Sequence, residues 1–186
     1  MIILATASPY RIQAFEMLGL KFKAIDADIE EMFEGRPGSS RELVLELAKR
    51  KAEAIKEEGL IIGFDSVGAI DGEILEKPKD REEGISRLNR MSGKEIHLIT
   101  GVHMIFGDKI LSDAVDTKVM MRDIDDKEIE RYIDQDPQFR TISLGFDPLT
   151  KYSSTFVHKI EGSYNNFLRA IPLERIVWML KEIGYL

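Results

Sequence analysis

The sequence of 186 residues predicts a mixed α/β protein with a β-rich middle. Apolar, strand-like segments alternate with helix patterns in the first part of the chain. Two long strand-like segments, 95–106 and 109–121, then follow each other directly, and an amphipathic helix begins at Pro172. Helices at both ends and long strands between them indicate a sheet covered by helices.

The first part of the chain predicts two strand–helix units. In order, they are a strand at 1–7, a helix at 8–20, a strand at 21–29 and a helix at 39–59. Ser8 is a favourable N-cap and Pro9 suits the first helical position. The second strand runs into an acidic loop that contains Gly and Pro, and Gly59 is expected to end the long helix.

The remaining elements are predicted from turn and capping signals. Asp71-Gly72 indicates a tight hairpin after an apolar strand at 60–65, and Gly107-Asp108 indicates a second hairpin between the long strands. Asp125 and Glu128 have the spacing of a capping box at the start of a helix. Further elements are expected as a helix at 80–92, a helix at 125–133, strands at 141–146 and 154–160, and the helix after Pro172.

Composition excludes several classes of function. The chain carries a formal net charge of −7, which disfavours binding to nucleic acid, and it has no cysteine for a disulfide, a thiolate metal site or a catalytic thiol. No apolar run reaches the length of a membrane span, and the short apolar start lacks the basic region of a signal peptide. We expect one domain, 1–186, without a separable linker, in a cytoplasmic protein that contacts neither nucleic acid nor membrane.

The first strand–helix junction is a candidate anion site. The N-terminus of a helix offers free N–H groups and a positive dipole end, and Ser8 and Arg11 could donate hydrogen bonds to the same anion. Ser8 could instead be only a helix cap and Arg11 a solvated side chain, and these residues alone favour that simpler interpretation.

Lys51, Asp65 and Lys77 are harder to explain structurally. Lys51 falls inside the apolar stripe of its helix, so its ammonium group either reaches along the helix edge to water or meets an anion. Asp65 is expected where an apolar strand ends, a position at which α/β sheets gather ligands and metals. Pro78 holds Lys77 in an extended conformation, although Lys-Pro pairs are common in loops.

Taken together, these residues and the acidic pair Glu30-Glu31 predict an anion site with a metal ion. The sequences GxxxxGK[ST], GxGxxG and GxSxG are absent, which argues against P-loop NTPases, Rossmann dehydrogenases and serine hydrolases. His97, His103 and His158 lack the spacing of metal ligands and are interpreted as structural.

Seven segments in order resemble the motifs of the Maf family. They are ATASPYR, IEE, LAKRKAEA, GFDSV, GEILEKP, LNRMSGKEIHLITGV and IEGSYNNFLRAIPL. Maf proteins are nucleoside triphosphate pyrophosphatases, distantly related to inosine triphosphatases. The resemblance implies two lobes around a long central mixed sheet with the active site in the cleft between them. It also implies hydrolysis of a nucleoside triphosphate to a monophosphate and pyrophosphate, a divalent cation (Mg²⁺, or Mn²⁺ or Co²⁺), and a homodimer.

The resemblance assigns roles to the residues already selected. Asp65 matches the catalytic carboxylate that accepts a proton from water, and Glu31 and Asp65 match metal-associated positions. The phosphate-contacting positions of the family fall on Ser8, Arg11, Lys51 and Lys77. Cations near Asp65 are expected to keep it ionised at neutral pH.

The specificity positions of the family are mixed in this chain. The branch acting on dTTP and UTP has arginine where Tyr10 stands, threonine where Ser66 stands, and a glutamine in a late segment that corresponds to 141–155 here. The branch acting on 7-methyl-GTP has an aromatic residue at the position of Tyr10 but differs elsewhere. A tyrosine can stack on any base, so the base stays open.

Two alternatives to this activity remain. One is an inosine triphosphatase-like enzyme that acts on purine nucleotides. The other is a non-catalytic, nucleotide-binding regulator of cell division, because fold does not fix function.

Overall fold

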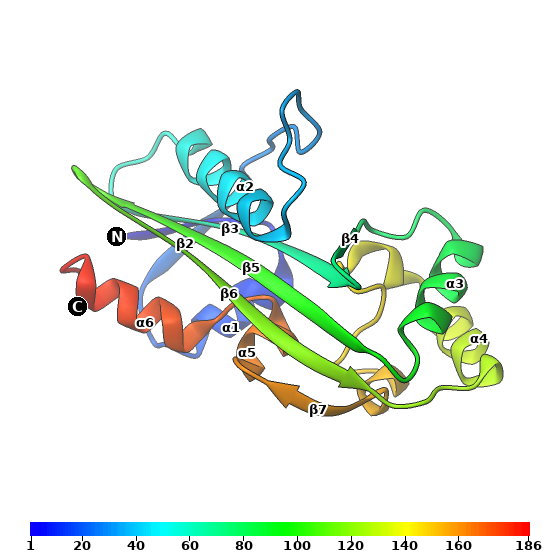
Figure 1. Cartoon of the computed structure of the whole chain (residues 1–186). Coiled ribbons are helices and arrows are strands. Elements are labelled where there is room, and N and C mark those ends of the chain that lie inside the picture. The colour runs from blue at the N-terminus through cyan, green and yellow to red at the C-terminus, as the bar shows by residue number, and fades with distance from the viewer.

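The computed structural model describes residues 1–186 as a seven-stranded mixed sheet with helices on both faces (Figure 1). The strand order is β2 (Phe22–Ile25), β1 (Ile2–Ala5), β3 (Leu60–Ile70), β5 (Glu95–Phe106), β6 (Lys109–Met121) and β7 (Val157–Glu161). A short strand, β4 (Glu73–Leu75), pairs with the end of β3. The mixed α/β fold expected from the sequence is confirmed.

The helices cover the sheet unevenly along its length. They are α1 (Pro9–Glu16), α2 (Ser40–Ala54), α3 (Arg81–Met91), α4 (Asp126–Gln135), α5 (Tyr164–Arg169) and α6 (Leu173–Glu182). In Figure 1, α2 lies on one face of the sheet and α1 and α6 lie on the other, while α3 and α4 gather at the far end of the long strands. No helix is both long and apolar enough to cross a membrane.

Two apolar cores correspond to two lobes. One lies between α1, α6 and the sheet and includes Phe15, Phe64 and Ile176. The other lies between α3, α4 and the far ends of β5 and β6 and includes Leu88 and Phe146. The long strands contribute side chains to both cores, so they connect the two lobes.

Strand β3 is longer than the sequence predicted. A strand was expected at 60–65, but β3 continues to Ile70 because β5 pairs with it from Leu60 to Ala69. Only its first part is parallel to β1, and this pairing ends at Gly63. Asp65 therefore lies within a strand, just beyond the carboxyl end of β1, and not at a strand terminus.

Capping signals gave helix starts more reliably than helix ends. Ser8, Ser39 and Asp125 accept hydrogen bonds from the first turns of α1, α2 and α4, and the capping box at Asp125 is confirmed. The predicted helix at 39–59 is wrong at its end, because α2 stops at Ala54. Ile55 is extended and buried beside β1 and β3, and this packing turns the chain toward the sheet.

The region before the last helix differs most from expectation. The predicted strand at 141–146 is absent: the chain forms a 3₁₀ helix (Pro137–Thr141) followed by turns. Leu144 and Phe146 are nevertheless buried, with Gly145 between them at a φ of 79°. Strand β7 is shorter than the predicted 154–160 at its start, and helix α5, capped by Ser163, was not predicted.

Candidate active site

The loop from β1 to α1 forms one wall of a cleft. The Ser8 N–H donates to Thr6 Oγ1 at 3.1 Å, and Ser8 Oγ accepts a long hydrogen bond of 3.5 Å from the Arg11 N–H. Capping uses the oxygen of Ser8 as an acceptor, so its hydroxyl proton remains available to an anion. The capping and anion-binding interpretations of Ser8 are therefore compatible.

Lys51 joins two carboxylates at the centre of the cleft. Its Nζ donates to Asp65 Oδ1 at 2.7 Å and to Glu31 Oε1 at 2.7 Å. The Lys51 side chain is 16% exposed, that of Asp65 9% and that of Glu31 49%. Of the two interpretations of Lys51, the one in which its ammonium group meets an anion is therefore correct. In this structure the anions are the carboxylates of Asp65 and Glu31.

The two carboxyl groups bound to Lys51 have opposite pKa shifts. Burial raises the pKa of Asp65 above its ordinary value, and this effect outweighs the attraction of Lys51 and Arg11. Burial also acts on Glu31, but there the hydrogen bond and charge of Lys51, with Lys77 and Arg11, lower the pKa overall. The cations therefore do not set the direction of the shift at Asp65, because burial has the larger effect, and ionisation of Asp65 at neutral pH stays a prediction. A raised pKa makes Asp65 a better proton acceptor than an exposed aspartate.

Arg11 is buried and links three parts of the chain. Its Nε donates to the Ala170 carbonyl at 2.8 Å and its Nη2 donates to Ser66 Oγ at 2.7 Å. Ser66 Oγ also lies 2.7 Å from Thr100 Oγ1, on the neighbouring strand β5. Arg11 is not the solvated side chain of the simpler interpretation, and Ser66 positions its guanidinium group.

The predicted site residues converge on this cleft. It comprises two adjoining hollows of about 530 and 370 Å³. The side chains to which the resemblance assigns positions all line it, namely Ser8, Tyr10, Arg11, Glu31, Lys51, Asp65, Ser66 and Lys77, whereas Glu30 of the acidic pair does not. The convergence of residues from five separate segments is a result of the fold.

Other residues of the cleft were missed. Arg36, Glu76, Asp26 and Asp28 line it, as do Gln138 from the 3₁₀ helix and Thr141 and Ser143 from the segment where a strand was wrongly predicted. Arg36 is the one basic residue between Glu30 and Ser40, and a lone basic side chain in an acidic loop could have indicated a place in the anion site. The later residues carry no such signal.

The charges in the cleft fit a metal ion. Four basic side chains (Arg11, Arg36, Lys51 and Lys77) face five acidic ones (Asp26, Asp28, Glu31, Asp65 and Glu76). No group of three or more His, Cys, Asp or Glu side chains is arranged to hold a metal without other ligands. Magnesium is often bound by one or two carboxylates together with substrate phosphates, and Glu31 and Asp65 fit that pattern.

The histidines lie away from the cleft. His97 pairs with Asp116 at 2.9 Å, and His103 shares a hydrogen bond of 2.7 Å with Ser112. Neither histidine lines the two hollows, which agrees with their interpretation as structural.

A small apolar pocket of about 50 Å³ adjoins the cleft at Tyr10. Its walls include Leu144, Phe146 and Phe167, and its polar members include Asp147. Burial, followed by the charges of Asp147 and Asp136, raises the pKa of the Tyr10 hydroxyl. Tyr10 therefore remains a neutral aromatic ring between a polar hollow and an apolar one.

Comparison with known proteins agrees with this architecture. A HAM1 protein from Coxiella burnetii has a similar fold, with a TM-score of 0.53 at 15% identity over 97% of this chain and 98% of that one. The dTTP/UTP pyrophosphatase of Dictyoglomus turgidum is 35% identical over 99% of this chain and 96% of its own length. The dTTP/UTP pyrophosphatase of Thermotoga maritima is also 35% identical, over 99% of this chain and 90% of its own.

A family model matches residues 1–183, nearly the whole chain, and its description is Maf-like protein. The match includes every residue of the cleft and both lobes. The similarity is therefore not confined to one motif or to the strand–helix start of the chain. The chain belongs to the family of Maf-like proteins.

Proposed function

We propose that this protein hydrolyses a nucleoside triphosphate to a nucleoside monophosphate and pyrophosphate in the cleft between its lobes. The observation that carries the proposal is the hydrogen bonding of Lys51 to both Asp65 and Glu31, beside the start of α1. A structural ion pair needs only one cation and one anion. Here Lys51 binds two carboxylates, and three further basic side chains line the same open cleft, namely Arg11, Arg36 and Lys77. The names of the similar dTTP/UTP pyrophosphatases support the same reaction.

Asp65 is the proton acceptor of the proposed reaction. A water oxygen attacks the α-phosphorus, the bond from that phosphorus to the bridging oxygen breaks, and pyrophosphate leaves. The attacking water passes its proton to the Asp65 carboxylate, whose pKa is raised by burial. The hydrogen bond from Lys51 fixes the orientation of this carboxylate.

The basic side chains bind and orient the phosphates. An ammonium group has three N–H donors, and Lys51 uses two of them on carboxylates, which leaves one for a phosphate oxygen. Ser8, Arg11 and Lys77 line the same cleft: Ser8 donates a hydrogen bond to a phosphate oxygen, and Arg11 and Lys77 neutralise further phosphate charge.

Glu31 and Asp65 are the side chains that would hold a divalent cation, Mg²⁺ or alternatively Mn²⁺ or Co²⁺. When bound, such a cation supplies positive charge that stabilises the pyrophosphate leaving group. The excess of acidic over basic groups in the cleft supports this requirement, because a triphosphate alone would meet net repulsion.

For the base, we propose a pyrimidine nucleotide, UTP or dTTP, stacked on Tyr10. The names of the relatives support this choice, and the small size of the apolar pocket beside Tyr10 favours a single ring. Stacking of a base on an aromatic side chain contributes on the order of 1–3 kcal/mol. Tyr10→Ala should therefore raise KM for the preferred nucleotide by about tenfold or more.

The deciding experiment is a hydrolysis screen. Canonical nucleoside triphosphates, ITP and 7-methyl-GTP are incubated with the protein and Mg²⁺, Mn²⁺ or Co²⁺, and pyrophosphate is separated from orthophosphate. Pyrophosphate release that is greatest with UTP or dTTP is the expected result. Orthophosphate release overturns the proposed reaction, preference for ITP favours the purine enzyme, and nucleotide binding without turnover favours the regulator.

A further inference from the structure

Arg36 holds an unusual position above the cleft. It lies in the loop between β2 and α2, where Gly35 takes a φ of 76° and Pro37 follows. This loop is anchored, because Phe33 packs against a smaller apolar cluster that includes Leu43 and Leu47 of α2, and its ring centroid lies 3.4 Å from the guanidinium carbon of Arg50. The anchoring holds this loop in place, and the Arg36 side chain joins the lining of the cleft.

The hydrogen bonding of Arg36 is incomplete. Its Nη2 lies 2.8 Å from Glu76 Oε1, but its Nε is buried without any partner. Its Nη1 also makes no hydrogen bond within the protein. A buried donor without a partner costs free energy, and the side chain is only 21% exposed, so this arrangement requires an explanation.

The pairing with Glu76 is easy to exchange. The Glu76 side chain is 59% exposed, and only one nitrogen of the guanidinium group faces it. Exposed ion pairs of this kind contribute little to stability. Glu76 also directly precedes Lys77, so an anion that reaches Lys77 comes close to the carboxylate that now occupies Arg36.

We propose that Arg36 is a substrate-binding residue that Glu76 holds in the free protein and that the polyphosphate chain of the nucleotide takes over. A guanidinium group matches two phosphate oxygens at once, which a single carboxylate oxygen does not do for it here. Arg36 then brings its unused donors to the substrate, and Glu76 acts as an internal competitor that the substrate displaces. The inference rests on the proposed function, since it assigns a further binding residue to that cleft.

The test uses four single variants of the full chain, and the probes are UTP for turnover and inorganic pyrophosphate for binding, both with Mg²⁺. Arg36→Gln removes the proposed ligand, and Glu76→Gln removes its competitor. Arg41→Gln is the matched arginine control, because Arg41 pairs with Asp113 outside the cleft. Glu34→Gln is the matched glutamate control, since Glu34 lies in the same loop without an ion pair.

Arg36→Gln is expected to raise KM for UTP and Kd for pyrophosphate by about tenfold, the worth of one good charge-assisted contact, with kcat changed less than about threefold. Glu76→Gln is expected to lower both constants by several-fold. In the double variant Arg36→Gln/Glu76→Gln, both constants should equal those of Arg36→Gln alone, because Glu76 acts only through its ion pair with Arg36. Both controls should remain close to the unsubstituted protein.

The inference is overturned if Arg36→Gln and Arg41→Gln change Kd for pyrophosphate equally. It is also overturned if Glu76→Gln changes this Kd by the same factor whether or not Arg36 is present. If Arg36→Gln does not fold, Arg36→Lys keeps the charge but loses the planar fork, and should still raise Kd for pyrophosphate several-fold. A protein that releases no pyrophosphate from any nucleotide refutes the proposed function, while calorimetry with inorganic pyrophosphate still decides the role of Arg36.

Discussion

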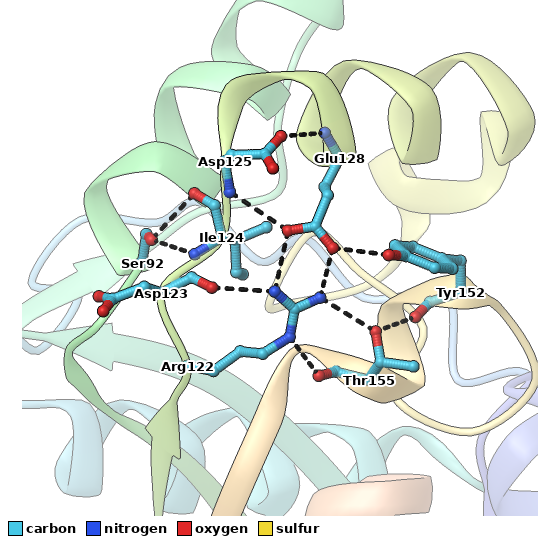
Figure 2. Close-up of polar contacts among 8 residues, drawn as sticks. All are labelled: Ser92, Arg122, Asp123, Ile124, Asp125, Glu128, Tyr152 and Thr155. Carbon is cyan, nitrogen blue, oxygen red and sulfur yellow. Dashed lines mark hydrogen bonds and ion pairs between the residues drawn. The ribbon is translucent and has the colours of Figure 1, made fainter.

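Two ion-pair networks in this molecule differ in how completely their donors are used. The cleft network consists of Glu31, Lys51 and Asp65. The outer network, at the far end of the sheet, consists of Arg122, Glu128, Tyr152 and Thr155 and is drawn in Figure 2. Both join segments that are distant in the sequence, but only one of them is complete.

In the outer network every N–H donor of Arg122 has a partner. Its guanidinium group forms two hydrogen bonds with Glu128, two with Thr155 and one with the Asp123 carbonyl. Tyr152 adds a further hydrogen bond of 2.6 Å to Glu128. The hydrogen bond from Arg122 is the main cause that lowers the pKa of Glu128 to about 2. Nothing is left for a ligand.

In and beside the cleft network, some hydrogen-bond donors have no partner within the protein. Lys51 has one unused donor, Arg11 engages only Nε and Nη2, and burial raises the pKa of Asp65. A saturated network holds segments together, whereas an unsaturated and buried one costs stability unless a ligand completes it. The contrast assigns a structural role to the outer network and a ligand-binding role to the cleft network, on hydrogen bonding alone.

The largest effect is expected from Asp65→Asn. The amide keeps the size of the carboxylate but cannot accept a proton from water, so kcat should fall on the order of 10²-fold or more. Stability should change little, because Lys51 keeps its hydrogen bond to the Glu31 carboxylate and is not left without an anion. Turnover is measured beside thermal unfolding, and near-normal turnover would contradict the role of Asp65.

A matched control comes from the outer network. Glu128→Gln is also a carboxylate-to-amide change in an ion pair, and kcat should stay within about twofold, because Glu128 does not line the cleft. If both variants lose activity equally, the separation between the two networks fails.

Lys51→Met should affect both activity and stability. It removes a phosphate donor, so kcat/KM should fall by roughly tenfold or more, and it leaves the Asp65 carboxylate buried without its nearest cation. We expect the free energy of unfolding to fall by about 1–3 kcal/mol. The measurements are steady-state kinetics and denaturant unfolding.

The double variant Lys51→Met/Asp65→Asn sharpens this result. Removing both charges together should restore much of the lost stability but none of the activity, because neighbouring residues are not additive. If Lys51→Met costs as much stability in the Asp65→Asn background as it does alone, Lys51 and Asp65 are not energetically coupled.

Local sequence signals explain how much of the fold and the site was predictable. Ser8, Ser39 and Asp125 cap helices through bonds to residues three positions away, so the chain itself displays them. Helical periodicity likewise placed Lys51 on the buried face of α2. These signals act within one element and survive without knowledge of the fold.

The missed features depend on partners far along the chain. Ile142, Leu144 and Phe146 alternate with other residues as in a strand. The backbone there forms turns instead, and Leu144 and Phe146 pack into the core beside α3 and α4. Asp65 continues a strand only because β5 lies beside it. Arg36 meets Glu76 across forty residues, a pairing that no local pattern indicates.

The outer network should affect stability alone. Arg122→Met removes a complete set of hydrogen bonds from a side chain that is part exposed, so the free energy of unfolding should fall by about 1–2 kcal/mol. For a chain of this size, Tm should fall by roughly 2–8 °C. Differential scanning calorimetry gives this value, and kinetics well below Tm should show an almost unchanged KM. A large rise in KM would mean that the outer network also shapes the cleft.

The smallest effect is a pH dependence at Glu128. Its pKa in the folded protein is about 2, below the ordinary value of 4.5, so the unfolded chain binds a proton more readily than the folded one. The stability that Glu128 contributes is therefore complete above pH 4.5 and is lost as the pH falls toward 2.

The comparison of Tm between the unsubstituted protein and Glu128→Gln isolates this contribution from that of other carboxyl groups. At pH 6 the variant should melt roughly 1–3 °C lower, because the ion pair is solvent-screened. The gap should narrow as the pH falls from 4.5 toward about 2 and close below that value, because Glu128 is then protonated in the folded protein as well, and glutamic acid and glutamine are both neutral. Glu130→Gln, at an exposed position of α4 outside the outer network, should show no gap at either pH. A gap that keeps its full size down to about pH 2 would show that shape and hydrogen bonding, and not the charge of Glu128, hold the outer network together.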